Sequence, residues 1–154
     1  MKKKGSIATL VLLICLACTT ALIFGTSESF AQDGNTEAIE DSIVALQNAY
    51  RAQAGLAPLT EIDALAQAAD IRAGECGISF SHTRPDGSIW WTVEPDLAYG
   101  ENLAYGYRSA EEAVNAWMCS AAHMYNILSP DYRTCGVGVV MSGGTWYYVV
   151  EFGY

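Results

Sequence analysis

Residues 135–152 restrict the fold more than any other part of the chain, because they have the pattern of a β-hairpin. Two runs rich in β-branched and aromatic side chains, 135–141 and 145–152, are joined by Ser-Gly-Gly, which suits a turn. The segments ahead of the hairpin have the spacing of helices. Helices early in the chain, followed by strands around one core, predict an α+β domain in which helices cover an antiparallel sheet.

Apolar side chains recur at helical spacing in the segments that precede the hairpin. A first helix is predicted to start at Asn35 or Thr36 and to stop at Gly55. A second is predicted from Thr60, a candidate cap, to a stop near Gly74 to Gly77.

A third helical segment begins at Ser109, where Glu112 three residues later completes a capping box, and it closes at Pro130. Ser120 is a candidate cap at which a further helix starts. The aromatic stretch 97–107 is interrupted by glycines and fits a short strand and a turn.

The N-terminus has the outline of a signal peptide. A basic start is followed by an apolar run from Ile7 to Phe24 and by a small, polar stretch that ends at Ala31. Residues 1–31 are therefore predicted to be a signal peptide cleaved after Ala31, or else an uncleaved N-terminal anchor, because the run is long enough to span a bilayer. Residues 32–154 then form a single domain that is secreted, extracellular or at the cell surface, with membrane attachment only through an uncleaved N-terminus.

The charge of the mature part argues against nucleic acid as a partner. The first 31 residues hold three of the eight basic residues and one of the 17 acidic residues, so residues 32–154 keep five arginines and 16 acids, a formal net charge of −11. Such a surface repels phosphate backbones and anionic lipid headgroups.

Three cysteines remain in the mature part: Cys76, Cys119 and Cys135. After export one pair could oxidise and leave one thiol over. Loop entropy favours a Cys76–Cys135 bridge, at about 4 kcal/mol, slightly over Cys119–Cys135, at about 3 kcal/mol. That difference is too small to decide the pairing.

The candidate chemistry rests on two histidines and one acid. Glu101 is a carboxylate inside an apolar, aromatic stretch, where burial without a partner would be costly. His82 and His123 are the only imidazoles in the chain, and with Glu101 they form the donor set that a zinc site uses. Alternatively, each histidine is an ordinary hydrogen-bonded residue and Glu101 ties loops together.

A nucleophilic site is the other chemical interpretation. Ser120 stands three residues before His123 and Cys119 four before it, so both are within helical reach of the imidazole. The chain has no Gly-x-Ser-x-Gly elbow, and Ser120 has a competing role as a helix cap.

Five short motifs occur in an order that resembles the CAP superfamily, which groups cysteine-rich secretory proteins, antigen 5 and plant pathogenesis-related proteins. The motifs are Ser-His-Thr-Arg-Pro-Asp-Gly at 81–87, Gly-Glu-Asn-Leu at 100–103, Ala-Val-Asn-Ala-Trp at 113–117, His-x-x-Asn-Ile-Leu-Ser-Pro at 123–130, and Cys-Gly-Val-Gly-Val at 135–139. Each is weak alone, but five in sequence are specific. The chain looks like the short bacterial branch, over Thr36 to Tyr154.

The resemblance implies an α-β-α sandwich with a central antiparallel sheet flanked by helices. It also implies a cleft lined by His82, Glu101 and His123, with zinc as a candidate ion on the two histidines. The fuller family pattern has a second acid three positions after the tryptophan, where this chain has Ser120. The set is therefore one carboxylate short, which weakens the case for tight metal binding.

Three functions follow as hypotheses. The first is a secreted binding module whose cleft, or a groove lined by Trp90, Trp91 and Tyr105, holds a small ligand that is apolar or derived from the cell surface. The second is a hydrolase in which His82 or His123 acts as a base, with or without zinc; the lack of a visible nucleophile or oxyanion device weighs against it. The third is a domain that binds partners by its surface alone.

Overall fold

A computed structural model describes residues 36–154, so the predicted signal peptide or anchor lies outside the described residues. The elements run in the order α2 (Thr36–Gln53), β1 (Thr60–Glu61), α3 (Asp63–Ile78), η1 (Trp90–Val93), β2 (Gly100–Tyr105), α4 (Ala110–Met118), α5 (Ala121–Ile127), β3 (Thr134–Ser142) and β4 (Thr145–Gly153). Within this range no helix combines the length and the apolar character needed to cross a membrane.

The predicted C-terminal hairpin is formed by β3 and β4, which pair antiparallel from Thr134 opposite Gly153 to Ser142 opposite Thr145. Strand β2 pairs antiparallel with the other side of β4. The strand order is β1-β3-β4-β2. The expectation of a purely antiparallel sheet is wrong at one edge, because the two-residue strand β1 pairs in parallel with β3.

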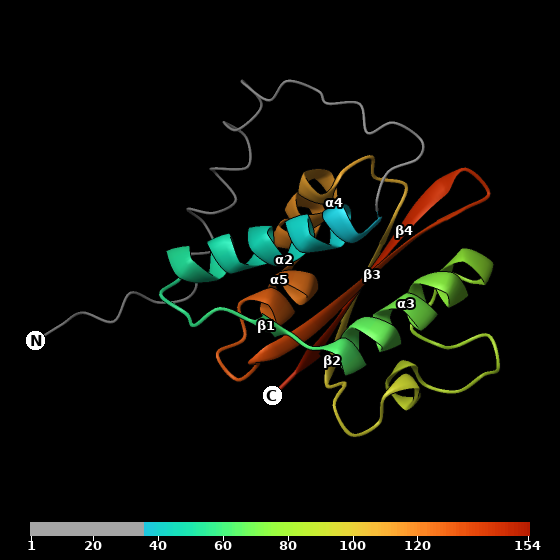
Figure 1. Cartoon of the computed structure of the whole chain (residues 1–154), viewed down its shortest axis with the longest axis horizontal. Coiled ribbons are helices and arrows are strands. Elements are labelled where there is room, and N and C mark those ends of the chain that lie inside the picture. The colour runs from blue at the N-terminus through green and yellow to red at the C-terminus, as the bar shows by residue number, and fades with distance from the viewer. Residues whose placement is uncertain (1–35) are drawn as a thin grey trace, which may run out of the picture.

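Helix α3 covers one face of the sheet, and α2, α4 and α5 lie on the other (Figure 1). This arrangement confirms the predicted α+β class and the α-β-α sandwich. Thr60, expected to cap the second helix, belongs to β1 instead, and Ile62 precedes the first helical residue Asp63. Ser109 does cap α4, since its hydroxyl accepts the Glu112 N–H at 3.3 Å.

Two glycines let α3 approach the sheet closely. A Cβ at Gly136 would lie 2.0 Å from the backbone carbon of Leu65, and one at Gly138 would lie 2.3 Å from that of Ala69. Both distances are far inside van der Waals contact, so only glycine fits at either position. The backbone of α3 therefore packs directly on β3, with alanines providing most of the small side chains between them.

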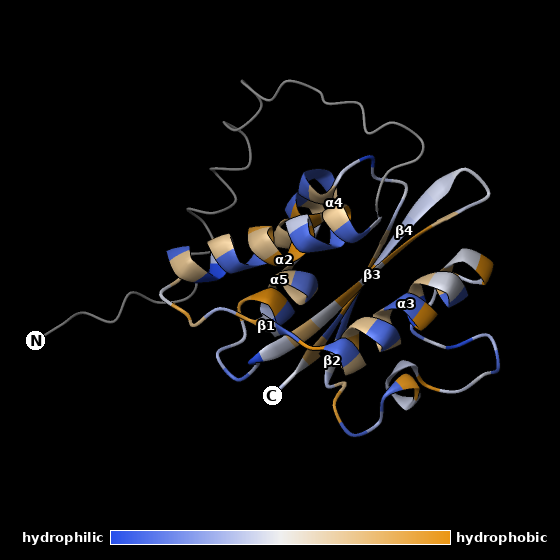
Figure 2. Ribbon diagram, viewed as in Figure 1, coloured by the Kyte–Doolittle hydropathy of each residue, from blue (hydrophilic) through white to orange (hydrophobic). Residues whose placement is uncertain are grey.

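The larger core lies on the opposite face of the sheet. Trp117 of α4, Tyr148 and Phe152 of β4 and Ile43 of α2 are each at most 1% exposed there. The helices that cover the sheet carry both apolar and hydrophilic segments, as expected for elements with one face in the core (Figure 2).

A buried arginine ties α2 to the end of α5. Arg51 is 0% exposed, and its guanidinium donates hydrogen bonds to the backbone oxygens of Ala57, Ile127, Ser129 and Tyr132. Its charge therefore meets carbonyl dipoles, including that of Ile127 at the C-terminal end of α5, where a cation is favoured.

The Cys76–Cys135 disulfide, which loop entropy slightly favours, is not formed in the structure, and the two thiols lie on opposite faces of the sheet. Cys76 packs with the small cluster beneath α3, whereas Cys135 belongs to the larger core. Both are free cysteines at 1% exposure or less. Burial raises the pKa of Cys76 to about 11 and that of Cys135 to about 12, so both remain neutral thiols.

Two carboxylates cover the open side of β3 beyond the short strand β1. Glu61 accepts the backbone N–H of Val137 at 3.4 Å, and Glu40 of α2 accepts that of Val139 at 3.0 Å. The outward-facing N–H groups of Val137 and Val139 are thus bonded within the molecule.

Candidate functional site

Strand β2 turns Glu101 toward α3, beneath the sheet. Side chains alternate along a strand, so Glu101 shares a face with Leu103, which packs in the cluster under α3. Glu151 of β4 stands directly opposite Glu101 in the antiparallel register. Two acidic side chains therefore enter the same apolar layer, with Glu101 5% exposed and Glu151 0%.

The main partner of Glu101 is Arg72 of α3, which is not among the predicted site residues. The Arg72 Nε donates to Glu101 Oε2 at 2.8 Å, and both side chains are at most 1% exposed. The guanidinium also donates to the backbone oxygen of Ser81 at 2.7 Å and to Glu75 at 2.6 Å. The cost of burying the Glu101 charge is therefore offset by a hydrogen-bonded ion pair.

A second arginine extends this network outward. Arg84, in the loop after α3, donates through both Nε and Nη2 to Glu75, with its Nη2 2.7 Å from Oε1. The hydrogen bonds from Arg84 and Arg72 lower the pKa of Glu75, although partial burial acts against them. The chain of charges thus runs from the protein interior to the surface.

His82 joins the network from the loop that follows α3. Its Nδ1 lies 2.6 Å from Glu101 Oε1, while 56% of the His82 side chain is exposed. The loop is held by hydrogen bonding between Trp90 N–H and the His82 carbonyl at 3.1 Å and by a bridge between Thr83 and Ile89. A buried carboxylate therefore orients an imidazole whose outer part faces solvent.

Glu151 is the least compensated group of the network. Neither of its carboxyl oxygens has a hydrogen-bond partner among the described residues. Burial is the main cause that raises the pKa of Glu151 well above its ordinary value, and the nearby Glu101 charge adds to it. The surroundings of Glu151 therefore favour its neutral form, which leaves Arg72 to balance mainly Glu101 and part of Glu75.

A pair of asparagines positions the second histidine. The Asn126 side chain on α5 donates to Asn102 Oδ1 at 2.9 Å, and the Asn102 amide donates to the His123 backbone oxygen at 3.1 Å. Because Asn102 adjoins Glu101 on β2, these bonds fix α5 against the strand that carries the acid. Burial lowers the pKa of His123, and the proximity of His82 lowers it further, so His123 is neutral at neutral pH.

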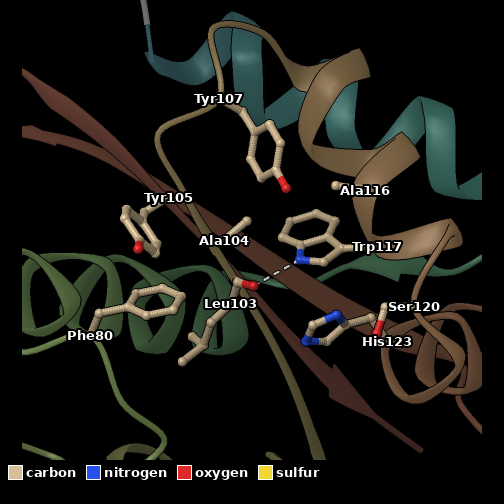
Figure 3. Close-up of a pocket in the computed structure, with 9 residues that line it drawn as sticks. All are labelled: Phe80, Leu103, Ala104, Tyr105, Tyr107, Ala116, Trp117, Ser120 and His123. Atoms are coloured by element: carbon tan, nitrogen blue, oxygen red, sulfur yellow. Dashed lines mark hydrogen bonds between the residues drawn. The ribbon is translucent and has the colours of Figure 1, made fainter.

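A cavity of about 280 Å³ opens between β2 and α4. Figure 3 shows Phe80 and Tyr105 on one side, Trp117 and Tyr107 above Leu103, and His123 with Ser120 on the other side. Its full lining is Phe80, Leu103, Ala104, Tyr105, Tyr107, Ala116, Trp117, Ser120 and His123. Trp117 Nε1 donates to the Leu103 carbonyl at 3.0 Å, which fixes the indole in the wall.

The four residues predicted to share a cleft fall into two pairs. Glu101 and His82 are hydrogen-bonded to each other, whereas Ser120 and His123 line the cavity. Ser120 is the N-cap residue of α5 as predicted, but its side chain makes no capping hydrogen bond. Its hydroxyl stands instead at the cavity wall (Figure 3).

The groove predicted from Trp90, Trp91 and Tyr105 is wrong as a single feature. Tyr105 lines the cavity beside α4, and its ring stacks with that of Tyr147 at a centroid distance of 6.0 Å. Trp90 and Trp91 line a different cavity near Tyr99. The aromatic residues therefore serve two separate surfaces.

The residues do not fit a zinc ion. No group of three or more His, Cys, Asp or Glu side chains that could hold a metal ion is found within residues 36–154. Both oxygens of Glu101 are already hydrogen-bonded, one to Arg72 and one to His82. The guanidinium supplies the positive charge that the predicted metal on His82 and His123 would have provided.

Arg72 and Glu151 could have been found from spacing. Leu65, Ala69 and Cys76 are buried on α3, and Arg72 lies three residues after Ala69 and four before Cys76, on the same stripe. Glu151 similarly follows the buried Val149 by two positions along a strand. A charged residue at a position that an apolar stripe places in the core indicates a buried ionisable group, which needs a partner inside the protein.

Comparison with known proteins identifies related chains. The CAP family, described as the cysteine-rich secretory protein family, matches residues 44–152. An uncharacterized protein, YkwD, from Bacillus subtilis is 34% identical over 128 residues, covering 79% of this chain and 50% of that protein. The chain thus spans about half the length of this curated relative.

Two solved structures share the fold at 22% sequence identity and a TM-score of 0.69. One is an extracellular protein containing a SCP domain from Bacillus anthracis, and the match covers 76% of this chain and 40% of that chain. The other is an outer surface protein from Borrelia burgdorferi, for which 77% of this chain and 94% of that chain are covered.

Proposed function

The chain belongs to the cysteine-rich secretory protein (CAP) family, and we propose that it is an exported binding module that holds a small, mainly apolar ligand in the cavity between β2 and α4. The family predicted from the five motifs is thereby confirmed. Export is supported by the predicted signal peptide and by structural neighbours described as extracellular or outer surface proteins.

The lining of the cavity carries the proposal. Phe80, Tyr105, Tyr107 and Trp117 give the cavity an aromatic lining, to which Leu103, Ala104 and Ala116 add aliphatic groups. Polar groups are few: Ser120 and His123 lie together on one side, and the two tyrosines add their hydroxyls (Figure 3). Small-molecule sites have this composition, in which apolar walls supply binding energy and a few polar groups fix orientation. Because the pKa of His123 is lowered, its neutral imidazole can hydrogen-bond a hydroxyl or carboxyl head group.

The size of the cavity limits the ligand. A volume of about 280 Å³ lies just below the range of typical small-molecule sites, which is roughly 300–1,000 Å³. A medium-length acyl chain or a single ring system fits this space, whereas a whole sterol would leave much of its surface in water. We therefore expect the module to favour a medium-chain lipid over a sterol.

Displacement of a fluorescent apolar dye tests the binding. A medium-chain fatty alcohol or fatty acid should displace the dye from residues 32–154, and cholesterol should displace it more weakly. Tyr105→Ala should weaken the displacement severalfold, because the Tyr105 ring is part of the wall. Tyr99→Ala is the matched control, since Tyr99 is similarly exposed, at 48% against 54%, but lines the other cavity. Equal displacement in both variants would remove the cavity as the binding site.

A second candidate function is a hydrolase that uses His82. The observation that favours it is the 2.6 Å contact between His82 Nδ1 and the buried Glu101, which orients an exposed imidazole as the acid of a catalytic dyad does. In that role the outer nitrogen, Nε2, would take a proton from water. Turnover of a peptidase and esterase panel that disappears in His82→Gln and survives in His123→Gln would support this function; turnover that is equal in both variants would contradict it.

A further inference from the structure

A second cavity, of about 310 Å³, lies beside the 3-10 helix η1 and shares no lining residue with the cavity of the proposed function. It is lined by Trp90, Trp91, Pro95, Ala98 and Tyr99. The lining is therefore three aromatic rings with a proline and an alanine, and it contains no charged side chain.

The two tryptophans meet at a right angle. The ring planes of Trp90 and Trp91 are inclined at 89°, with their centroids 6.0 Å apart. Trp91 is 43% exposed and Tyr99 is 48% exposed, so both remain accessible from solvent. Aromatic faces carry negative electrostatic potential, and walls at an angle can contact a rounded cation on more than one side.

Charge around the cavity also favours a cation. Glu94 and Asp96 flank the lining residue Pro95 along the chain, and residues 32–154 carry a formal net charge of −11. The arginine of the preceding loop, Arg84, is already paired with Glu75 through two nitrogens. A cationic ligand therefore meets favourable long-range electrostatics at this surface.

Hydrogen bonds hold the cavity walls in place. The N–H of Trp90 donates to the His82 carbonyl at 3.1 Å, and that of Glu94 donates to the Trp91 carbonyl at 3.2 Å. The N–H of Ala98 donates to the Glu94 carbonyl at 3.0 Å, and the Tyr99 hydroxyl bonds to the Asp96 carbonyl at 3.2 Å. A preformed site loses little conformational entropy when a ligand binds.

We propose that this cavity binds a quaternary ammonium group, such as the trimethylammonium head of choline. Methylated nitrogen spreads its charge over apolar methyl groups, which match walls made only of aromatic rings, proline and alanine. A primary ammonium would lose hydrogen bonds to water here, and among the lining side chains only the Tyr99 hydroxyl could accept one in return. Recognition of quaternary ammonium ions by aromatic cages is a general use of cation–π attraction.

The four tryptophan indole N–H signals give a direct test by NMR, because only two of them belong to this cavity. Choline should shift the signals of Trp90 and Trp91 and leave those of Trp117 and Trp146 unchanged. The neutral isostere 3,3-dimethylbutan-1-ol has the same shape without the charge, and it should bind about tenfold more weakly. Ethanolamine, which keeps a charge but lacks the methyl groups, should bind similarly weakly.

Two variants localise the site. Trp91→Leu should abolish the shift of the Trp90 signal, while an unchanged Trp117 signal verifies that the variant is folded. Tyr105→Ala alters the other cavity and should leave choline binding intact, so failure of this inference and failure of the proposed function are distinguishable. Equal binding of the neutral isostere would show that the cavity recognises apolar shape and not positive charge, which would contradict the proposal. The absence of any shift with choline would also overturn it.

A vesicle experiment separates the two sources of this chemistry. Co-sedimentation with phosphatidylcholine vesicles but not with phosphatidylethanolamine vesicles would assign the site to a lipid headgroup at a membrane surface. Binding of free choline without co-sedimentation would assign it to a soluble quaternary ammonium compound. Both results support the recognition of trimethylammonium, whereas equal sedimentation with the two lipids and no choline binding would contradict it.

Discussion

Arg72 on α3 and Glu101 on β2, 29 positions apart in the chain, form an ion pair of 2.8 Å in which neither side chain is more than 1% exposed. The same guanidinium reaches Glu75 and the Ser81 carbonyl. It thus connects the helix, the loop that carries His82 and the strand that carries Glu101. The structure of the histidine–glutamate pair depends on this one cation.

Replacing Arg72 by methionine should destabilise the protein by about 3–5 kcal/mol, because it removes the buried cation from the Glu101 carboxylate and leaves only the half-exposed His82 beside it. Arg108→Met is the matched control, since the Arg108–Glu112 pair is at the surface, with side chains 87% and 41% exposed. Arg108→Met should lower the free energy of unfolding by at most about 0.5 kcal/mol. Urea unfolding at pH 7 measures both, and similar costs in the two variants would refute the assigned role of Arg72.

Glu151→Gln should make the protein more resistant to alkaline pH. The folded-state pKa of Glu151 is raised above the ordinary value of 4.5, so its stabilising contribution is complete below that pH and is lost as the pH rises through the folded-state pKa. Glutamine cannot ionise and avoids this loss. The melting temperature of the variant should therefore be close to that of wild type at pH 5 and higher than that of wild type at pH 9. A wild-type protein that gained stability with pH relative to the variant would contradict this assignment.

Glu40→Gln should stabilise the protein above neutral pH. Burial, followed by the charge of Asp70, raises the pKa of Glu40 from 4.5 to about 7, so ionisation between these values weakens the fold. The glutamine oxygen can still accept the Val139 N–H, which lies 3.0 Å away from the acid. Melting temperatures of the variants and of wild type at pH 5 and pH 8 test this. Glu40→Gln should melt above wild type at pH 8 but not at pH 5, whereas the exposed control Glu37→Gln should match wild type at both pH values.

Gly136→Ala should destabilise the protein by about 3 kcal/mol or more, because the new methyl group would overlap the α3 backbone at Leu65 and overpacking is costly. Gly74→Ala provides the opposite case. It lies within α3 with no atom within 4 Å of its added Cβ, so alanine should stabilise the helix by up to about 1 kcal/mol. Chemical denaturation compares the two, and a tolerated Gly136→Ala would disprove the close packing of helix and sheet.

The sequence predicted those elements whose periodicity is strong and local. The C-terminal hairpin and the helix from Thr36 were visible because many side chains repeat one spacing. Strand β1 was missed, since two residues are too few to show an alternation. The position of Thr60 at a helix entrance resembled a cap, but backbone pairing with Thr134 prevailed.

The site was predicted only in part, for a physical reason. Contact between His82 and Glu101 agreed with the expected need for a partner beside the acid. The identity of the neutralising cation depended on which face of α3 packs on the sheet, and the sequence analysis considered only apolar residues on that face. Histidine, a metal ion or backbone donors were therefore the expected partners of Glu101, and Arg72 was missed.

The carboxylates of Glu61 and Glu40 have a consequence for how copies of this protein behave at high concentration. They already bond the Val137 and Val139 amide groups, the donors that an extended segment from another molecule would need in order to lengthen the sheet. An incoming strand would have to break both bonds and pass two acidic groups. The molecule is thereby protected against fibril growth through this edge without needing a longer strand to cover it.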